Sequence, residues 1–391
     1  AGDVELPDDF VMYAPQRGEP DRWWESFDSD ALDALVETAL EDNFSLAEAA
    51  ARVEQSFAIA RQRRSSRVPQ LNYSAGVGFS EVHRDAGFGA VPPGNLTEGS
   101  ESYSVGLGTA YEVDLWGRLR GDRRAAVLDA AAFEEDLYAA KQSIAGLVAT
   151  VWLDLLEVRQ ALAVTHDQIE TNQRRLGLIE FSFRKGSATG LDVAQQRQLI
   201  ARTQTLIPPL ELLHLLLSQE LAVLLGKVPG TELELGGEAY PVVEGVPEVG
   251  IPADLLGRRP DVRAAGLRLQ SADWRVSVAR ADRLPALSLV SAFSFNGDDI
   301  DILFDNWLAT LTGSVTGPIF DGGRRKFETI RTQAVVNERL SQYRRVVLTA
   351  IQEVEGALAR MDRQQAFIEA LKKQYEAGKS THLIAENRYE K

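Results

Sequence analysis

Two very long stretches without proline constrain the fold of this chain more than any other feature. Between residues 118 and 185 only three glycines interrupt a run rich in Ala, Leu, Glu, Gln and Arg, and between 324 and 391 only two do so. These residue types favour helix, and at 1.5 Å per residue each stretch would reach roughly 100 Å. A helix of that length needs lateral partners, as in a coiled coil or helical barrel.

Four short segments show a different pattern, with a period of two residues. They are 71–82, 102–114, 287–296 and 307–316, and each alternates aromatic or aliphatic residues with Ser, Thr, Gly or Asn. This period predicts strands. Apolar residues on one face and small polar residues on the other are typical of membrane β-strands, and the segments match the ~9–11 residues that such a strand needs.

The apolar positions of these segments are expected to face lipid. They are Leu71, Tyr73, Val77, Phe79, Tyr103, Val105, Leu107, Tyr111, Leu289, Phe293, Phe295, Trp307, Leu311 and Val315. In hydrocarbon every backbone polar group must be paired, so a membrane sheet must close into a barrel. Four strands are too few for that, because the smallest bacterial barrels have eight. Two chains would enclose an interior filled by side chains. Three chains can leave a pore, and the small polar faces favour this open interior.

The chain uses one structural unit twice: a helix, a β-hairpin and a long helix. Arg67-Val68-Pro69-Gln70-Leu71 opens the first hairpin, and Arg283-Leu284-Pro285-Ala286-Leu287 opens the second. A return helix is expected over Leu191–Leu225, well buried because Leu206–Leu225 is densely apolar. The second repeat reaches Lys391 where its turn should come, so its return helix is missing from this sequence.

These features predict a mainly α-helical protein with a transmembrane β-barrel and a mixed α/β region. The expected divisions are an extended tail (1–22), helices (23–66), a first membrane hairpin (67–116), a long helix with its tip and return helix (117–225), a linker (226–258), a helix (259–284), a second membrane hairpin (285–320) and a second long helix (321–391). The linker is expected to hold small strands at Leu233–Leu235 and Tyr240–Val243.

Composition excludes several functions. The net charge of −15 argues against nucleic-acid binding, which needs a basic surface. No cysteine is present and the four histidines are far apart, so we expect no metal site, no catalytic site and no cofactor. No signal peptide is visible, and no run of 18 apolar residues occurs, so no transmembrane helix is expected.

Two groups of charged residues remain open to a structural or a functional interpretation. Asp192 is either an acid at the start of a helix or a member of a symmetric acidic ring that narrows a tube. Arg118, Arg120, Arg123 and Arg124 follow a strand, where they would hold a membrane boundary or simply solvate a helix. In Arg259-Pro260-Asp261, proline suits the first turn of a helix and the acid suits its N-terminal dipole.

Four motifs resemble the outer-membrane factor family, the TolC- and OprM-like channel-tunnels, and most closely its NodT-type lipoprotein branch, which serves RND-type pumps. They are Tyr111–Arg120 and Gly317–Arg324 at the two strand-to-helix junctions, Ile251–Val262 between the repeats, and Phe183–Gly186 with Leu191–Val193 at a helical tip. The resemblance covers residues from about Trp23 to Lys391.

The resemblance implies a homotrimer in the outer membrane of a Gram-negative bacterium, with a twelve-stranded barrel, a periplasmic helical barrel and an equatorial collar. It implies efflux of small molecules together with a periplasmic adaptor and an inner-membrane RND pump. Its tip residues, for adaptor contact or constriction, are Arg184, Lys185, Gly186, Gly190, Leu191 and Asp192. The branch usually begins with a lipidated cysteine and places its gate in the final helix. Both features are missing from this sequence, so lipidation and the gate stay unassigned.

Two other functions remain as alternatives. One is a type I secretion conduit for a polypeptide on the same fold. The other is a soluble coiled-coil scaffold, which predicts charged residues on the polar faces of the strand segments, where they are scarce.

Overall fold

A computed structural model describes residues 22–84, 96–237, 240–241 and 257–389. The chain divides into two compact units, one formed by Ala1–Val53 with Phe133–Asp261 and the other by Glu54–Ala132 with Val262–Lys391. The elements are η1 (Trp23–Phe27), α1 (Asp30–Asp42), α2 (Phe44–Ser65), β1 (Gln70–Arg84), β2 (Leu96–Val113), α3 (Arg118–Arg184), α4 (Gly190–Gln204), α5 (Ile207–Leu224), α7 (Pro260–Ala281), β3 (Ala286–Gly297), η2 (Ile300–Ile302), β4 (Trp307–Thr316) and α8 (Arg324–Tyr389).

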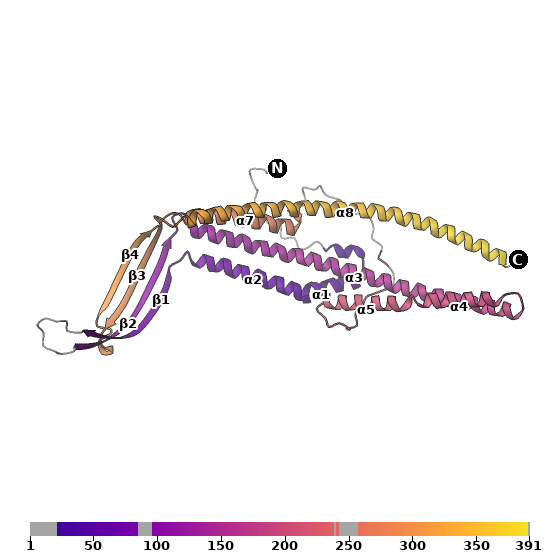
Figure 1. Ribbon diagram of the computed structural model, residues 1–391, viewed down its shortest axis with the longest axis horizontal. Coiled ribbons are helices and arrows are strands. Elements are labelled where there is room, and N and C mark those ends of the chain that lie inside the picture. Colours follow the sequence, from indigo (N-terminus) through magenta and orange to yellow (C-terminus); the bar gives the residue numbers. More distant parts are fainter. Residues whose placement is uncertain (1–21, 85–95, 238–239, 242–256, 390–391) are drawn as a thin grey trace. The chain divides into compact units, whose positions relative to one another are not determined.

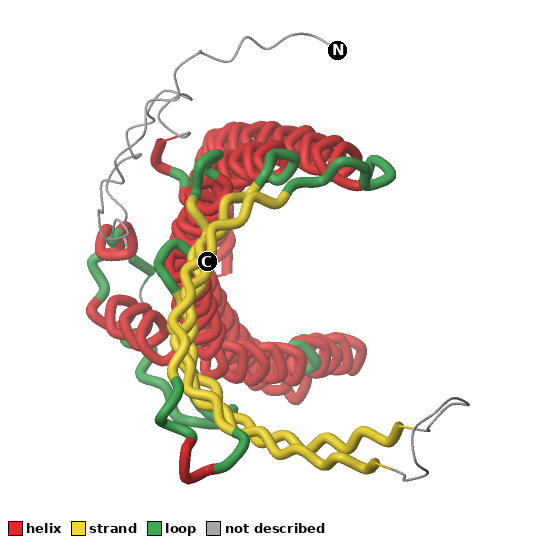
Figure 2. The backbone as a smooth tube through the Cα atoms, turned by 90° about the vertical axis from the view of Figure 1, so that its left-hand side faces the viewer, coloured by secondary structure: helices red, strands yellow, loops and turns green. Residues whose placement is uncertain are grey.

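The second unit contains a four-stranded antiparallel sheet in the order β1-β2-β3-β4. All four predicted strands are confirmed, and β2 extends six residues further toward the N-terminus than the pattern indicated. The strands lie side by side in Figure 1 and curve into an arc in Figure 2. Because β1 and β4 are the first and last strands, each leaves one backbone edge without a partner in this sheet.

Each hairpin passes into a long helix through an aspartate that caps the helix start. Asp114 accepts hydrogen bonds from the backbone N–H groups of Leu119 (3.1 Å) and Arg120 (2.9 Å) at the start of α3. Asp321 accepts from those of Gly323 (2.9 Å) and Arg325 (3.2 Å) at the start of α8. Both long helices are confirmed, at 67 and 66 residues. Their starts are fixed by the same chemistry in each repeat.

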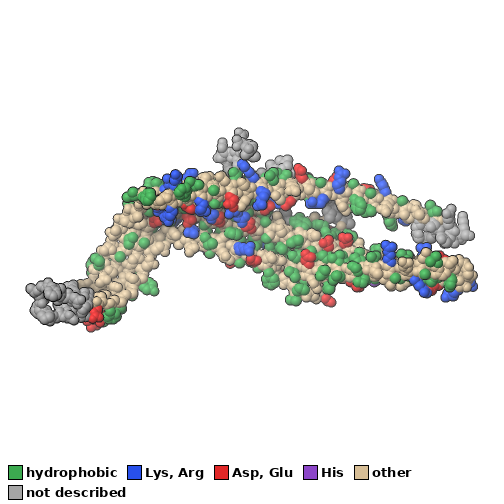
Figure 3. Space-filling view, in the orientation of Figure 1, with side chains coloured by type: hydrophobic (Ala, Val, Ile, Leu, Met, Phe, Trp, Pro, Cys, Tyr) green, Lys and Arg blue, Asp and Glu red, His purple; other side chains and the backbone are tan. Residues whose placement is uncertain are grey.

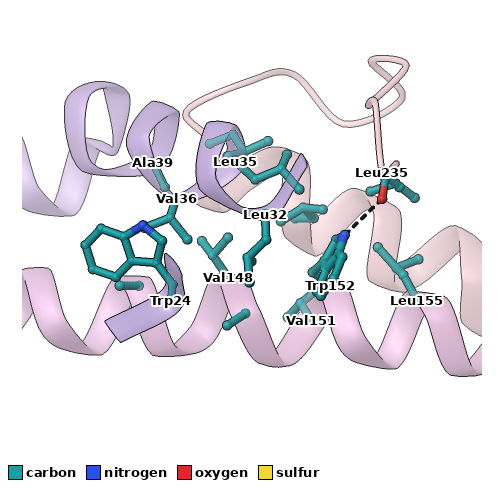
Figure 4. Close-up of a cluster of buried hydrophobic side chains, with 14 of the residues drawn as sticks. Trp24, Leu32, Leu35, Val36, Ala39, Val148, Val151, Trp152, Leu155 and Leu235 are labelled. Atoms are coloured by element: carbon teal, nitrogen blue, oxygen red, sulfur yellow. Dashed lines mark hydrogen bonds between the residues drawn. The ribbon is translucent and has the colours of Figure 1, made fainter. Parts of the chain in front are cut away.

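The first unit has its own hydrophobic core, drawn in Figure 4. Leu32 and Val36 of α1 pack against Val148 and Leu155 of α3, and all four are buried. The indole Nε1 of Trp152 donates a 3.0 Å hydrogen bond to the carbonyl oxygen of Leu235. A buried indole N–H needs such a partner. This bond holds the segment after α5 against α3.

The predicted return helix is two helices in the structure. Helix α4 ends at Gln204 and α5 begins at Ile207, with proline in its first turn. Pro208 has no backbone N–H, and its ring would clash with the carbonyl of the residue four positions earlier in a continuous helix. The prediction of one unbroken helix over 191–225 was therefore wrong.

The expected burial of this segment is also wrong for a single chain. Four of the eight leucines of α5 are exposed, namely Leu212, Leu213, Leu215 and Leu216, and only Leu221 and Ala222 of this helix are buried. By length and composition alone, the segment Gly190–Leu224 could cross a membrane, and 11% of its apolar window is buried. The exposed leucines form a strip that the protomer alone does not cover.

Other expectations have mixed outcomes. Helix α7 begins at Pro260, and Arg259 pairs with the first-turn acid Asp261 at 2.8 Å, which confirms the structural interpretation of this motif. No strand forms at Leu233–Leu235, where the chain is irregular. Residues 1–21, 242–243 and 251–256, which carry most of the expected tail, part of the second small strand and part of the motif between repeats, lie outside the described residues.

Candidate functional site

The sheet register gathers the predicted apolar positions onto one face. Tyr73 pairs with Leu107, and Leu107 pairs with Phe293. Across the last pair of strands Phe295 lies opposite Trp307, and its ring contacts those of Phe293 and Phe304 at 5.2 Å between centroids. All fourteen residues predicted to face lipid lie at odd-numbered positions, and the register keeps odd positions opposite odd positions throughout. This surface is called the apolar face.

The opposite surface, called the polar face, carries the even-numbered positions of the same strands. Most residues that pair across this face are small, such as Gly76 opposite Ser104 and Gly106 opposite Ser294. A side chain at Gly106 would be crowded, because a Cβ would lie 3.2 Å from the backbone oxygen of Phe293. Val290 and Leu308 are apolar exceptions. In Figure 3 the strands show few charged side chains between their two ends.

Charged residues gather where the strands end and the helices begin. Arg118 pairs through both guanidinium ends with Glu112 (3.1 and 2.6 Å), and Asp282 lies 3.8 Å away. Arg120 pairs with Asp114 at 3.2 Å, so the two arginines share this junction with three acids. The guanidinium of Arg124 lies over the ring of Trp274 instead, at 4.8 Å. Each of these three arginines has a partner within its own chain, which is a structural role.

A cavity of about 500 Å³ lies beside this junction. The end of α2 and the connection to β1 line one side with Gln62, Ser65, Ser66 and Val68. The polar face lines the other side with residues that include Glu112. The cavity therefore lies at the same end of the sheet as the helix starts.

The predicted tip residues come together in the turn between α3 and α4. Helix α3 ends at Arg184, and Gly186 adopts a left-handed conformation (φ 80°) that favours glycine. Thr189 and Asp192 form a capping box: the Asp192 carboxylate accepts from the Thr189 backbone N–H and hydroxyl, both at 2.7 Å. These hydrogen bonds, chiefly the one from the hydroxyl, hold the pKa of Asp192 below its ordinary value. Leu191 is exposed beside them.

Sequence reasoning missed three of these residues. Thr189 was not assigned a role, although Thr-x-x-Asp before a helix is a capping-box pattern. The sequence reasoning noted the junction motifs but not that Asp114 and Asp321 cap the two long helices. An acid shortly before a long helical run was the available signal. Among the described residues no three His, Asp or Glu side chains are grouped to hold a metal ion.

Comparison with known proteins identifies the family of this chain. The model for outer membrane efflux proteins matches residues 35–227 and 251–391. The pyoverdine export outer membrane protein OpmQ of Pseudomonas putida is 33% identical over 373 residues, covering 94% of this chain and 78% of the relative. Outer membrane protein OprJ of Pseudomonas aeruginosa is 30% identical over 391 residues, covering 92% and 78%.

Solved structures show the same fold. The outer-membrane channel OprN superposes with a TM-score of 0.85 at 25% identity, covering 97% of this chain and 86% of that one. VceC of Vibrio cholerae gives a TM-score of 0.83 at 25% identity, covering 94% and 88%. These neighbours are trimeric channel-tunnels in which the trimer forms the barrel.

The fold predicted from the sequence is thus confirmed, as are the outer-membrane location and the role in efflux. The soluble scaffold is excluded by the outer-membrane location, and the polypeptide-secretion alternative is not favoured. The chain supplies four strands and the tunnel helices of a trimeric channel and catalyses no reaction. It belongs to the outer membrane efflux protein family.

Proposed function

We propose that three copies of this chain form the passive exit duct of a tripartite efflux system, working with a periplasmic adaptor protein and an inner-membrane RND pump. The duct releases drugs or other small molecules to the exterior. The observation that carries this proposal is the sheet register, which separates an apolar face from an almost uncharged face of Gly, Ser and Thr. Such a sheet fits a wall between lipid and water.

The fourteen residues of the apolar face are proposed to contact outer-membrane lipid. Exposed side chains on β1 and β4, such as Tyr73 and Leu311, support this assignment. A soluble protein rarely leaves so large an apolar surface uncovered. The aromatic cluster of Phe293, Phe295, Phe304 and Trp307 fits the interfacial girdle that membrane barrels carry.

The turn between α3 and α4 is proposed as the surface that meets the adaptor or narrows the tunnel. It presents Arg184, Lys185 and Leu191 as exposed side chains on a backbone held by the capping box. If the acidic ring exists, Asp192→Ala should raise the single-channel conductance in planar bilayers and change drug susceptibility. Unchanged conductance and susceptibility would leave Asp192 as a helix cap alone. The expected domain divisions are part of the same proposal, with 67–116 and 285–320 in the membrane.

The decisive experiment is deletion of the gene and complementation with the full chain. We expect the deletion strain to become more susceptible to dyes and antibiotics, and the full chain to restore resistance. A strain that loses only the export of a polypeptide would contradict the proposal. Co-purification of the channel with a periplasmic adaptor and an inner-membrane pump would identify its partners.

A second candidate cargo is a siderophore. Two relatives at 33% and 30% identity are named as pyoverdine export proteins. Measurement of siderophore in the medium of the deletion strain during iron limitation tests this cargo separately from drug efflux.

A further inference from the structure

The two edge strands determine which parts of neighbouring subunits meet. Strands β1 and β4 lie at opposite edges of the sheet and run antiparallel to each other. When three sheets close one barrel, β4 of one subunit must pair with β1 of the next, since each edge needs a partner. The end of β4 at Thr316 therefore comes beside the start of β1 at Gln70.

The tilt of the strands determines the register between β4 of one subunit and β1 of the next. Within one subunit the row that begins at Gln70 continues through Ala110 and Val290 to Thr312. Barrel strands tilt by about 35–45°, so four strands ~4.8 Å apart shift equivalent positions by about 4–6 residues. Strand β4 itself runs on past Thr312 to Thr316. The shift must be even to keep apolar positions on one face, so Gln70 of the neighbouring subunit lies beside Thr316 or Pro318. The residues that follow β4, up to Phe320, therefore come close to those that precede β1 in the neighbour, from Ser66 to Pro69.

The loop after β4 presents two apolar side chains in a fixed position. Phe320 is 90% exposed and Ile319 is fully exposed. At the start of the loop Gly317 lies so close to Pro285 that a Cβ would come within 3.1 Å of its ring. At its end the carboxylate of Asp321 holds the first amides of α8. The loop is therefore anchored on its own subunit at both ends while its apolar side chains have no cover there.

The connection between α2 and β1 offers a matching surface. Val68 is 53% exposed, and Ser65 and Ser66 line the open cavity at the end of α2. Gln70 is held by its own subunit, because its side-chain amide donates to the carbonyl oxygens of Ser65 (3.0 Å) and Val68 (3.4 Å). This connection is thus a shaped surface at the edge where the next subunit arrives.

We propose that Ile319 and Phe320 of one subunit pack against residues 66–69 of the next, forming a clasp at the base of the barrel. The clasp rests on the trimeric channel described above and continues its strand-to-strand interface. Three clasps per trimer cover apolar groups that each subunit alone leaves in water. They also hold the last strand of each subunit in register with the first strand of its neighbour.

Cysteine cross-linking tests this contact directly, because the chain contains no cysteine. Two double variants are prepared in the full chain, Phe320→Cys with Ser66→Cys and Phe320→Cys with Val68→Cys. Since every subunit carries both cysteines, oxidation in native membranes should link all three subunits covalently in at least one variant. The Cα atoms must come within about 7 Å for this bond. Phe320→Cys with Leu107→Cys is the matched control, because Leu107 lies on an inner strand.

The outcomes separate the clasp from its rivals. A trimer that is intact by native electrophoresis but forms no covalent trimer in either variant would overturn the clasp and leave the channel standing. A nitroxide at position 320 that collides with oxygen but not with a water-soluble nickel complex would show lipid contact, which likewise overturns the clasp alone. If the unmodified chain forms no trimer, both the clasp and the channel fail. As a second measurement, Phe320→Ser should lower the temperature at which the trimer dissociates, and Phe320→Leu should retain it.

Discussion

At the scale of single residues, polar side chains that hydrogen-bond to backbone groups fix the ends of the helices and strands. Asp114, Asp321 and the Thr189–Asp192 pair each satisfy backbone amides that a helix start leaves unpaired. Trp152 does the same for a carbonyl group inside the core of the first unit. These contacts position the junctions and the tip.

Replacement of Trp152 by phenylalanine should keep most of the packing but lose its hydrogen bond to Leu235. We expect a loss of about 1 kcal/mol in the free energy of unfolding, since the carbonyl stays buried without a donor. Trp152→Ala should cost about 3–5 kcal/mol, because it also leaves a cavity. Denaturant unfolding of the purified channel, followed by Trp fluorescence and helix content, measures both. Equal losses in the two variants would contradict the role of the hydrogen bond.

The capping box predicts a dependence on pH at the tip. The hydrogen bonds from Thr189 lower the pKa of Asp192 below its ordinary value, so the carboxylate stabilises the folded tip at neutral pH. This contribution is lost as the pH falls through the lowered pKa. Asp192→Asn should therefore speed amide exchange at the start of α4 at neutral pH and make little difference in strong acid. Thr189→Ala is the matched variant. If either substitution changed amide exchange equally at neutral pH and in strong acid, the result would argue against the capping box.

Residue-level features were the least predictable from the sequence. Asp192 was correctly identified as a candidate helix-start acid, but its partner Thr189 was not. The pairing of Arg118 with Glu112 depends on a turn of the chain between strand and helix, which no periodic pattern encodes. Contacts between residues far apart in sequence, such as Trp152 with Leu235, depend on packing that the sequence alone does not reveal.

At the scale of elements, periodicity predicted the strands and long helices because each pattern repeats over many residues. The break between α4 and α5 was missed although Pro208 marks it in the sequence. The burial of α5 was overestimated because an apolar helix also suits a surface that another subunit covers. A single sequence does not distinguish a core from an interface.

Two neighbouring positions in β4 test the two faces of the sheet. Leu311→Lys should cost about 2–4 kcal/mol if the residue faces lipid near the middle of the bilayer, and should reduce the amount of trimer in the membrane. Thr312→Lys lies on the polar face and should assemble normally. Heat-modifiable migration of membrane extracts in gel electrophoresis measures the assembly of both variants. Normal assembly of the Leu311 variant would place that face away from lipid.

At the scale of the whole molecule, the excess of acidic residues predicts a preference for cations. The net charge is −15 per chain, and the described strands carry few charges on the polar face. We expect a channel in planar bilayers to favour cations at low salt and to lose this preference at high salt. The Thr312→Lys variant adds three positive charges at one level of the barrel and should reduce the preference. A wild-type channel that prefers anions would contradict this prediction.

The bare strip of leucines on α5 has a consequence for how the channel is made. In a single newly exported chain, these side chains and two unpaired strand edges would be exposed to water. Such surfaces favour aggregation with other exposed chains. Because trimer formation depends on the third power of the subunit concentration, dilute subunits would wait longest in this exposed condition. Delivery of several subunits to one place of insertion would shorten that wait, and a chaperone that binds the exposed leucines would protect them during it.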